Sequence, residues 1–133
     1  MKVINVSGTR KRAIARATLK KGTGMVKING KPLDLFEPKY LRIKIQEALI
    51  LAEKEVQKID ISVRVAGGGP TGQADAARLA IGRGIVAYTE NEDIKERYAN
   101  YDRLLLVADV RRRESRKPNC RGKARSKRQK SYR

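Results

Sequence analysis

Residues 59–88 read IDISVRVAGGGPTGQADAARLAIGRGIVAY, and two hydrophobic periods follow each other within this stretch. Apolar and polar residues alternate from Ile59 to Val65, which predicts a strand with one buried face. Gly67-Gly68-Gly69-Pro70 ends that strand. Apolar residues then recur every three or four positions, which predicts a helix with one apolar face; they are Ala74, Ala77, Ile81, Ile85 and Tyr88. Arg78 is expected to point away from this face, and Gly82 and Gly84 to weaken the helix end.

The segment before residue 59 predicts a hairpin and another helix. Residues 3–20 have an extended pattern, and Met25 to Ile28 form a second short strand after a turn bracketed by Gly22 and Gly24. These two strands are expected to pair with each other. Pro38 suits the first turn of a helix, whose apolar positions repeat at helical spacing; they are Leu41, Ile45, Ala48, Leu49 and Ala52. This helix is expected to lie on the sheet.

The segment after residue 88 predicts a third helix and the end of the domain. Its start has two candidate caps, a capping box from Thr89 to Glu92 or Asn91 alone. Its apolar stripe consists of Ile94, Tyr98, Tyr101 and Leu105. Strands first and helices against one sheet indicate a two-layer α+β fold. We expect a globular domain over residues 1–110 and a basic extension over residues 111–133.

The charge distribution points to the kind of partner. The chain carries 32 Lys or Arg against 14 Asp or Glu, a net charge of +18. The last 23 residues alone hold twelve Lys or Arg and a single acid, Glu114. Like charges repel and leave little apolar surface to bury, so this extension is expected to stay disordered until a polyanion neutralises it. Nucleic acid is the predicted polyanion; a tail that only aids solubility is the alternative, although added acids serve solubility better than added bases.

Several functional classes are disfavoured by composition. No stretch approaches the roughly 18 to 20 apolar residues that span a bilayer, and a cytoplasmic protein without membrane contact is expected. The chain has one cysteine, Cys120, and no histidine. A disulfide framework, an ordinary Cys/His zinc site and His-based acid/base catalysis are therefore not expected. Cys120 is expected to be a passive thiol, and no cofactor, metal or small-molecule substrate is predicted.

The glycine-rich turn admits several functions. Gly67, Gly69 and Gly72 fit G-x-G-x-x-G between a strand and a helix, with Glu90 near the position of a ribose-binding acid, so a nucleotide-binding enzyme is one hypothesis. Three observations disfavour this hypothesis. The chain is small for a doubly wound sheet, and the segment before Glu90 resembles a helix end. The related P-loop pattern needs a Lys followed by Ser or Thr, and Gln73 and Ala74 stand at those positions. A purely structural turn is the simplest alternative. A third hypothesis is a phosphate site for RNA at the helix start, formed by Gly67, Gly68, Gly69, Gly72 and Gln73 and extended by Arg78 and Arg83.

A second basic cluster lies near the N-terminus. It consists of Arg10, Lys11, Arg12 and Arg16. A solvated strand face that discourages edge pairing is the alternative, but together with the glycine turn and the extension this cluster favours a broad RNA contact. The extension adds Arg111, Arg112, Arg113, Arg116, Lys117, Arg121, Lys123 and Arg125. No DNA-recognition motif is present, and with no Trp and one Phe a base-stacking platform is poorly supported. Recognition of RNA backbone and shape remains.

These residues resemble a known family, that of the universal small-subunit ribosomal protein nine. Residues 65–84 are similar to its signature of a glycine triplet, Gly-Gln, Ala, Arg and Ile-x-Arg. Residues 8–12 with 15–17 resemble its first strand, residues 28–36 its second hairpin arm, and residues 122–133 its C-terminal tail. The short N-terminus and the final residues are more similar to archaeal or eukaryotic members than to bacterial ones.

The resemblance implies a structural role in the ribosome and no enzymatic activity. It implies the α+β fold shared with the second domain of ribosomal protein five, contacts with rRNA of the small-subunit head and with neighbouring head proteins, and a tail that approaches the anticodon stem-loop of the peptidyl-site tRNA. The tRNA-contacting residues implied are Arg128, Lys130, Tyr132 and Arg133, where Tyr132 departs from the bacterial Lys. A free-standing RNA chaperone is the main alternative function.

Overall fold

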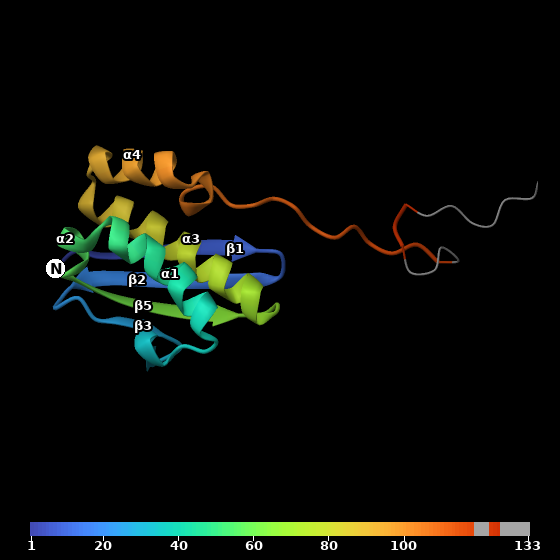
Figure 1. Ribbon diagram of the computed structural model, residues 1–133, viewed down its shortest axis with the longest axis horizontal. Helices are drawn as coiled ribbons and strands as arrows, with labels where there is room; N and C mark the ends of the chain where they lie inside the picture. Colours follow the sequence, from blue (N-terminus) through green and yellow to red (C-terminus); the bar gives the residue numbers. More distant parts are fainter. Residues whose placement is uncertain (119–122, 126–133) are drawn as a thin grey trace, which may run out of the picture.

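The computed structural model describes residues 1–118 and 123–125, and a five-stranded sheet forms the base of the fold (Figure 1). The strands lie in the order β1-β2-β5-β3-β4. Neighbours are antiparallel except β3 and β5, which are parallel. The bounds are β1 (Val3–Arg10), β2 (Ala13–Lys21), β3 (Val26–Ile28), β4 (Lys31–Pro32) and β5 (Ile59–Ala66). The strand predicted over residues 59–65 is thereby confirmed.

The predicted hairpin is wrong in its partners. Residues 3–20 do not form one strand, because a two-residue loop at Lys11 and Arg12 divides them into β1 and β2, which pair with each other. Lys11 adopts a φ of 53° to make this loop. Tight hairpin loops usually contain Gly, Asn or Asp, so Lys-Arg carries no turn signal in the sequence. Strand β3, expected to pair with this segment, pairs instead with β5 and β4.

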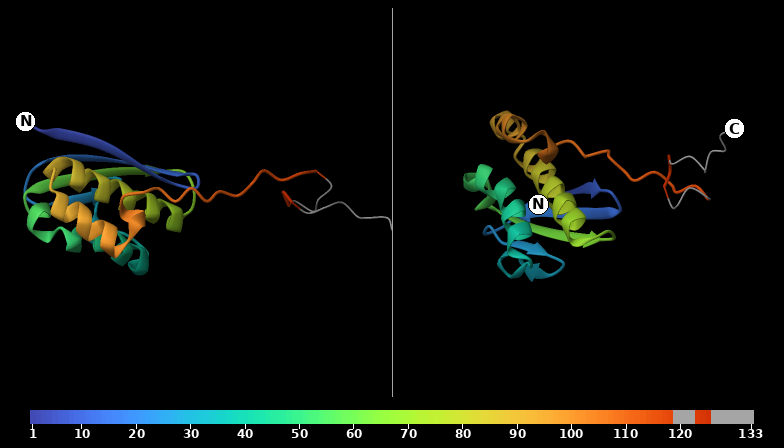
Figure 2. Two further views of the ribbon diagram at one scale, coloured as in Figure 1. Left: turned by 90° about the horizontal axis from the view of Figure 1, so that it is seen from above. Right: turned by 45° about the vertical axis from the view of Figure 1, so that its right-hand side comes forward.

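The helices all lie on one side of the sheet (Figure 2). Their bounds are α1 (Lys39–Leu51), α2 (Glu53–Val56), α3 (Pro70–Thr89) and α4 (Glu92–Tyr101), with short 3-10 turns η1 (Leu33–Leu35) and η2 (Arg103–Leu105). The three predicted helices are confirmed, but the apolar stripe predicted for the third is wrong at two positions, since Tyr101 is exposed and Leu105 lies in η2. Of the two candidate caps for α4, Asn91 is the one used, since its side chain accepts a hydrogen bond from the Asp93 N–H at 2.9 Å. Among the described residues, no helix is both long and apolar enough to cross a membrane.

The hydrophobic core lies between the sheet and the helices. Strand β2 contributes every second residue, Ala13, Ala15, Ala17 and Leu19, and β5 contributes Ile59, Ile61 and Val63. Helix α1 covers them with Leu41, Ile45 and Ala48, as its spacing predicts. Tyr98 of α4 reaches into this core and donates its hydroxyl hydrogen bond to the carbonyl of Ala48 at 2.6 Å. The structure therefore confirms the α+β fold class.

Helix α3 is buried on more than the one predicted face, because β1, β2, α1 and α4 all pack on it. Small residues allow this crowding: a Cβ on Gly8 of β1 would lie 2.6 Å from the carbonyl oxygen of Ala76. Gly82 and Gly84 are also buried, and α3 continues past them to Thr89. They allow Leu105 and Leu19 to pack against the helix.

Candidate nucleic-acid interface

The predicted N-terminal cluster is divided between two sides of the domain. Lys11 and Arg12 are exposed at the tip of the β1–β2 hairpin. Arg16 is exposed on β2, on the sheet face turned away from the helices. Arg10 turns inward, with its side chain only 14% exposed. Three of the four cations are therefore available to a partner, and the fourth has internal contacts.

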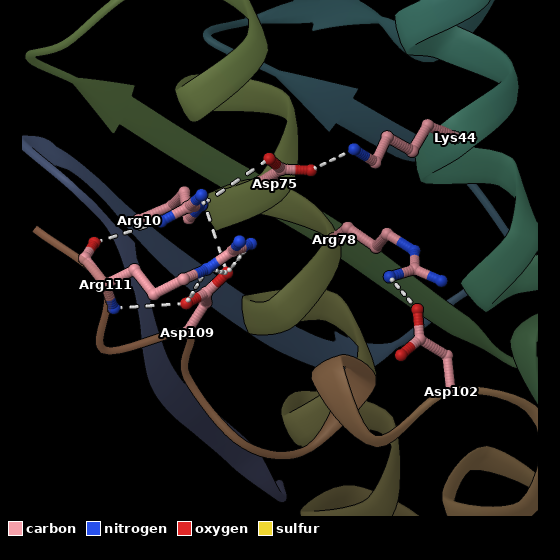
Figure 3. Close-up of polar contacts among 7 residues, drawn as sticks. All are labelled: Arg10, Lys44, Asp75, Arg78, Asp102, Asp109 and Arg111. Atoms are coloured by element: carbon pink, nitrogen blue, oxygen red, sulfur yellow. Dashed lines mark hydrogen bonds and ion pairs between the residues drawn. The ribbon is translucent and has the colours of Figure 1, made fainter.

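Those contacts of Arg10 fix the point where the C-terminal segment leaves the domain (Figure 3). Its guanidinium lies 3.8 Å from Asp75 of α3 and 3.4 Å from Asp109, and it donates a hydrogen bond to the carbonyl of Arg111 at 3.2 Å. Asp75 is also paired with Lys44 of α1 at 2.5 Å. Asp109 accepts hydrogen bonds from the side chain and backbone N–H of Arg111, and these hold the pKa of its carboxyl far below the ordinary value. We call Arg10, Asp75, Asp109 and Arg111 the tail root.

The glycine turn packs on the hairpin tip. Gly67 and Gly68 have φ values of 78° and 66°, which are strained for other residues. A Cβ on Gly67 would lie 2.6 Å from the carbonyl oxygen of Arg12, so the two loops are in direct contact. The Gln73 side chain donates a hydrogen bond to the Gly67 carbonyl at 3.1 Å and closes the turn. Gly69 is the N-cap of α3, with no side chain of the described residues capping the helix start. The turn and the exposed Arg12 thus form one continuous edge.

Arg78 points away from the apolar face of α3, as predicted, but it is buried against neighbouring helices. Arg78 is 5% exposed, and its guanidinium pairs with Glu47 of α1 at 2.9 Å and with Asp102 after α4 at 3.0 Å. Because α3 is surrounded, a residue outside its main apolar face still meets a neighbouring helix. Arg78 joins the three helices and does not contribute to the exposed surface.

Arg83 is also committed inside the domain. It donates hydrogen bonds to the carbonyls of Leu106 at 2.9 Å and Ser7 at 3.3 Å. These bonds hold the segment after η2 against β1. Both arginines that were expected to extend the phosphate site along α3 thus have partners within the domain, Arg78 while buried and Arg83 while half-buried.

The cations of the extension are exposed wherever the structure describes them. Beyond η2, the described residues up to 118 and from 123 to 125 form neither helix nor strand. Arg112, Arg113, Arg116, Lys117 and Lys123 are exposed, Arg111 pairs with Asp109, and Arg125 pairs with Glu114. The predicted residues Arg121, Arg128, Lys130, Tyr132 and Arg133, as well as Cys120, lie outside the described residues.

Three further cations, Lys20, Lys27 and Arg64, share the uncovered sheet face with Arg16. Sequence reasoning did not single them out, although the alternation in residues 59–65 already placed Arg64 opposite the buried side. The signal that brings all four residues together is the strand order, which the sequence did not predict correctly.

The candidate ribose ligand and the glycine turn lie at opposite ends of α3. Glu90, the candidate ribose ligand, ends α3 with a φ of 53° and pairs with Lys2 at 2.8 Å. This confirms that the segment before it is a helix end and not a second buried strand. Among the residues described, no group of three or more acids or cysteines could hold a metal ion.

Comparisons with known proteins agree with the resemblance in the sequence. The model of the ribosomal protein S9/S16 family matches residues 8–133. Two similar relatives are the small ribosomal subunit proteins uS9 of Methanococcus maripaludis strain S2, 51% identical, and of Methanococcus vannielii, 49% identical, each aligned over 100% of both chains. These relatives are named as ribosomal proteins, which confirms the prediction of a non-enzyme. The chain belongs to the ribosomal protein S9 family.

Proposed function

We propose that this protein is a structural component of the small ribosomal subunit and that it binds rRNA. The observation that carries the proposal is the 51% identity to a small-subunit protein over 100% of both chains, which includes the basic extension. Assembly into a ribonucleoprotein also explains the net charge of +18, because many Lys and Arg are needed to neutralise phosphates.

The exposed cations supply the rRNA contacts of this proposal. The hairpin tip with Lys11 and Arg12 adjoins the turn at residues 67–73, where backbone N–H groups at the start of α3 suit a phosphate. The extension adds a second contact, which orders as it meets phosphates. Arg78 and Arg83 are left out of this surface because their guanidinium groups are bound within the domain.

The finer part of the proposal concerns location within the subunit. We infer that the globular domain sits on rRNA of the head beside other head proteins, in cytoplasmic ribosomes, and that the extension approaches the peptidyl-site tRNA. Arg128, Lys130, Tyr132 and Arg133 are the residues proposed to reach the tRNA. The support is the similarity of residues 122–133 to the tail of the family.

Sedimentation tests the proposal directly. The chain, tagged at its N-terminus to leave the extension free, is expressed in Methanococcus maripaludis in place of the native protein, and lysates are run on sucrose gradients with and without ribonuclease. We expect one tagged chain per small subunit and release by ribonuclease. A chain that stays at the top of the gradient, or that follows many RNAs without fixed stoichiometry as a chaperone does, contradicts the proposal.

A further inference from the structure

One face of the sheet is uncovered. All helices pack on the opposite face (Figure 2), and β2 and β5 therefore present their alternate residues to solvent. We call this surface the open face; its polar residues are Asn5, Ser7, Arg16, Thr18, Lys20, Lys27, Asp60, Ser62 and Arg64. A groove with a volume of about 1110 Å³ lies on this face.

The open face carries a net positive charge. Arg12, Arg16, Lys20, Lys27 and Arg64 line the groove, and the single acid there is Asp60. Asp60 accepts hydrogen bonds from the backbone N–H groups of Thr23 at 2.8 Å and Met25 at 3.1 Å, so its charge holds the β2–β3 connection. Within the described part of the chain, none of the five cations forms an ion pair.

Two of these cations face each other across the sheet. Arg16 of β2 and Arg64 of β5 are direct partners in the antiparallel register. Like charges directly opposite each other on one face destabilise a sheet. The isolated domain thus retains a repulsive pair without a neutralising acid among the described residues, and an external anion placed between the two guanidinium groups removes the repulsion.

The neighbouring row across the sheet is polar and neutral. Thr18 lies opposite Asn5 on one side and Ser62 on the other, and the Thr18 hydroxyl donates a hydrogen bond to the Asn5 side chain at 2.8 Å. Hydroxyl and amide groups of this kind contact ribose and phosphate oxygens. The residues that line the groove include no aromatic side chain, so it lacks the stacking platform of proteins that bind single strands.

We propose that the open face is a docking surface for the sugar–phosphate backbone of folded RNA, with Arg16 and Arg64 gripping the same phosphate group. The inference rests on the proposed function, which supplies rRNA as the partner. It adds which surface of the protein binds the RNA and that this surface contacts the sugar–phosphate backbone. RNA is the occupant that the charge favours, because five cations line the groove against the single acid Asp60, and arginine forks match phosphate oxygens. The groove is continuous with Gly67 and Arg12, so this surface joins the edge formed by the hairpin tip and glycine turn.

The test compares the double variant Arg16→Gln/Arg64→Gln with a matched control, Arg97→Gln/Arg103→Gln, which removes two exposed cations from the helical side. The probe is a transcript of the small-subunit rRNA head domain from Methanococcus maripaludis, titrated at several salt concentrations. We expect the open-face variant to bind roughly 10- to 100-fold more weakly and its log–log salt slope to be smaller by about 1, because the two arginines neutralise one shared phosphate. The control keeps an affinity near that of the wild type.

A second readout separates binding from folding. Removing the repulsion between Arg16 and Arg64 leaves the urea midpoint of the domain unchanged or raises it, so weaker RNA binding by a fully folded variant supports the proposal. The proposal is overturned if both double variants bind the RNA with equal affinity. It is also overturned if the open-face variant keeps its RNA affinity and loses only its association with other proteins in the gradient. Failure of the wild type to bind this RNA and to sediment with small subunits removes the proposed function itself, and the inference with it.

Discussion

The guanidinium of Arg10 lies 3.4 Å from the carboxylate of Asp109, so the first strand holds the last anchored residue before the basic extension. Both side chains are largely buried, at 14% and 12% exposed. Asp109 in turn binds Arg111 through the backbone and the side chain. The extension therefore leaves the domain from a fixed point and in a fixed direction, although its later residues 112–118 are exposed.

The tail root is expected to withstand mild acid. Hydrogen bonds from the Arg111 side chain, and then from its backbone, hold the pKa of Asp109 far below the ordinary 3.8. A carboxyl whose pKa is lowered by folding stabilises the native state above its ordinary pKa, and loses that effect as the pH falls through the lowered value. Protection of the Arg111 amide against hydrogen exchange should stay constant from about pH 8 to about pH 5 and decline only below about pH 4. In Asp109→Asn this protection should be weaker throughout; a loss between pH 7 and 5 in the wild type contradicts the assignment.

Arg78 is expected to matter for stability and not for RNA affinity. Its partners Glu47 and Asp102 are about one-third exposed and can regain water when the arginine is removed. Arg78→Met should therefore cost about 1–3 kcal/mol of unfolding free energy. The double change Glu47→Gln/Asp102→Asn leaves a buried guanidinium without a countercharge and should cost more, about 3–5 kcal/mol. Urea denaturation gives both values, and the reverse order argues against this account.

Two glycines should respond with opposite signs to alanine. Gly8→Ala places a methyl group 2.6 Å from the Ala76 carbonyl and should destabilise the domain by about 1–3 kcal/mol, because the helix and strand backbones must separate. Gly72 lies inside α3, and its nearest atoms to an added Cβ are at 3.6 and 3.7 Å. Gly72→Ala should stabilise the domain by about 0.5–1 kcal/mol through helix propensity. Thermal unfolding of the two variants beside the wild type decides the point.

Deleting residues 111–133 is expected to separate RNA binding from folding. If about six of the twelve cations of the extension meet phosphates, the log–log salt slope should become smaller by about 4. The melting temperature should stay close to that of the full chain, because the Arg10–Asp109 pair remains. A full-length variant with a Gly/Ser extension of the same length controls for chain length, and an unaltered salt slope in either variant rules out the expected role of the extension.

The last residue is expected to act on tRNA and not on assembly. Arg133→Ala should leave incorporation into reconstituted small subunits unchanged and weaken peptidyl-site tRNA binding about tenfold, as for one lost charge-assisted hydrogen bond. Lys123→Ala removes the same charge from an exposed position earlier in the extension and serves as the control. Normal tRNA affinity of the Arg133→Ala subunits removes the proposed tRNA contact.

Local patterns predicted the elements that depend on neighbours in sequence. Alternation in residues 59–65 gave β5, and the three- and four-residue steps of the apolar positions gave α1, α3 and α4, because burial of one face imposes the period of the backbone. The loop at Lys11 and Arg12 was not predicted, because neither residue favours a turn. The parallel pairing of β3 with β5 was not predicted either, since it depends on contacts between residues more than thirty positions apart.

The candidate site was predicted from the positions of positive charges in the sequence. The structure shows which of these charges are exposed and which are already paired. Lys11, Arg12 and Arg16 are exposed as an interface requires, but Arg10, Arg78 and Arg83 find carboxylates or carbonyls within the domain. The hydrogen-bond partners of these three arginines lie 23 to 101 positions away in the sequence. Composition identifies a basic protein, whereas only the fold decides which cations are already neutralised.

The layered arrangement also gives the domain an electric dipole moment. Apart from the inward-turned Arg10, the five strands carry six exposed Lys or Arg against one acid, while the four α-helices carry eight against seven. The positive end of the dipole therefore lies on the side of the sheet, and the side of the helices carries little net charge. The electric field of a large polyanion exerts a torque on such a domain and turns its sheet side toward the polyanion before contact. Encounters therefore begin with the positive surface facing the polyanion.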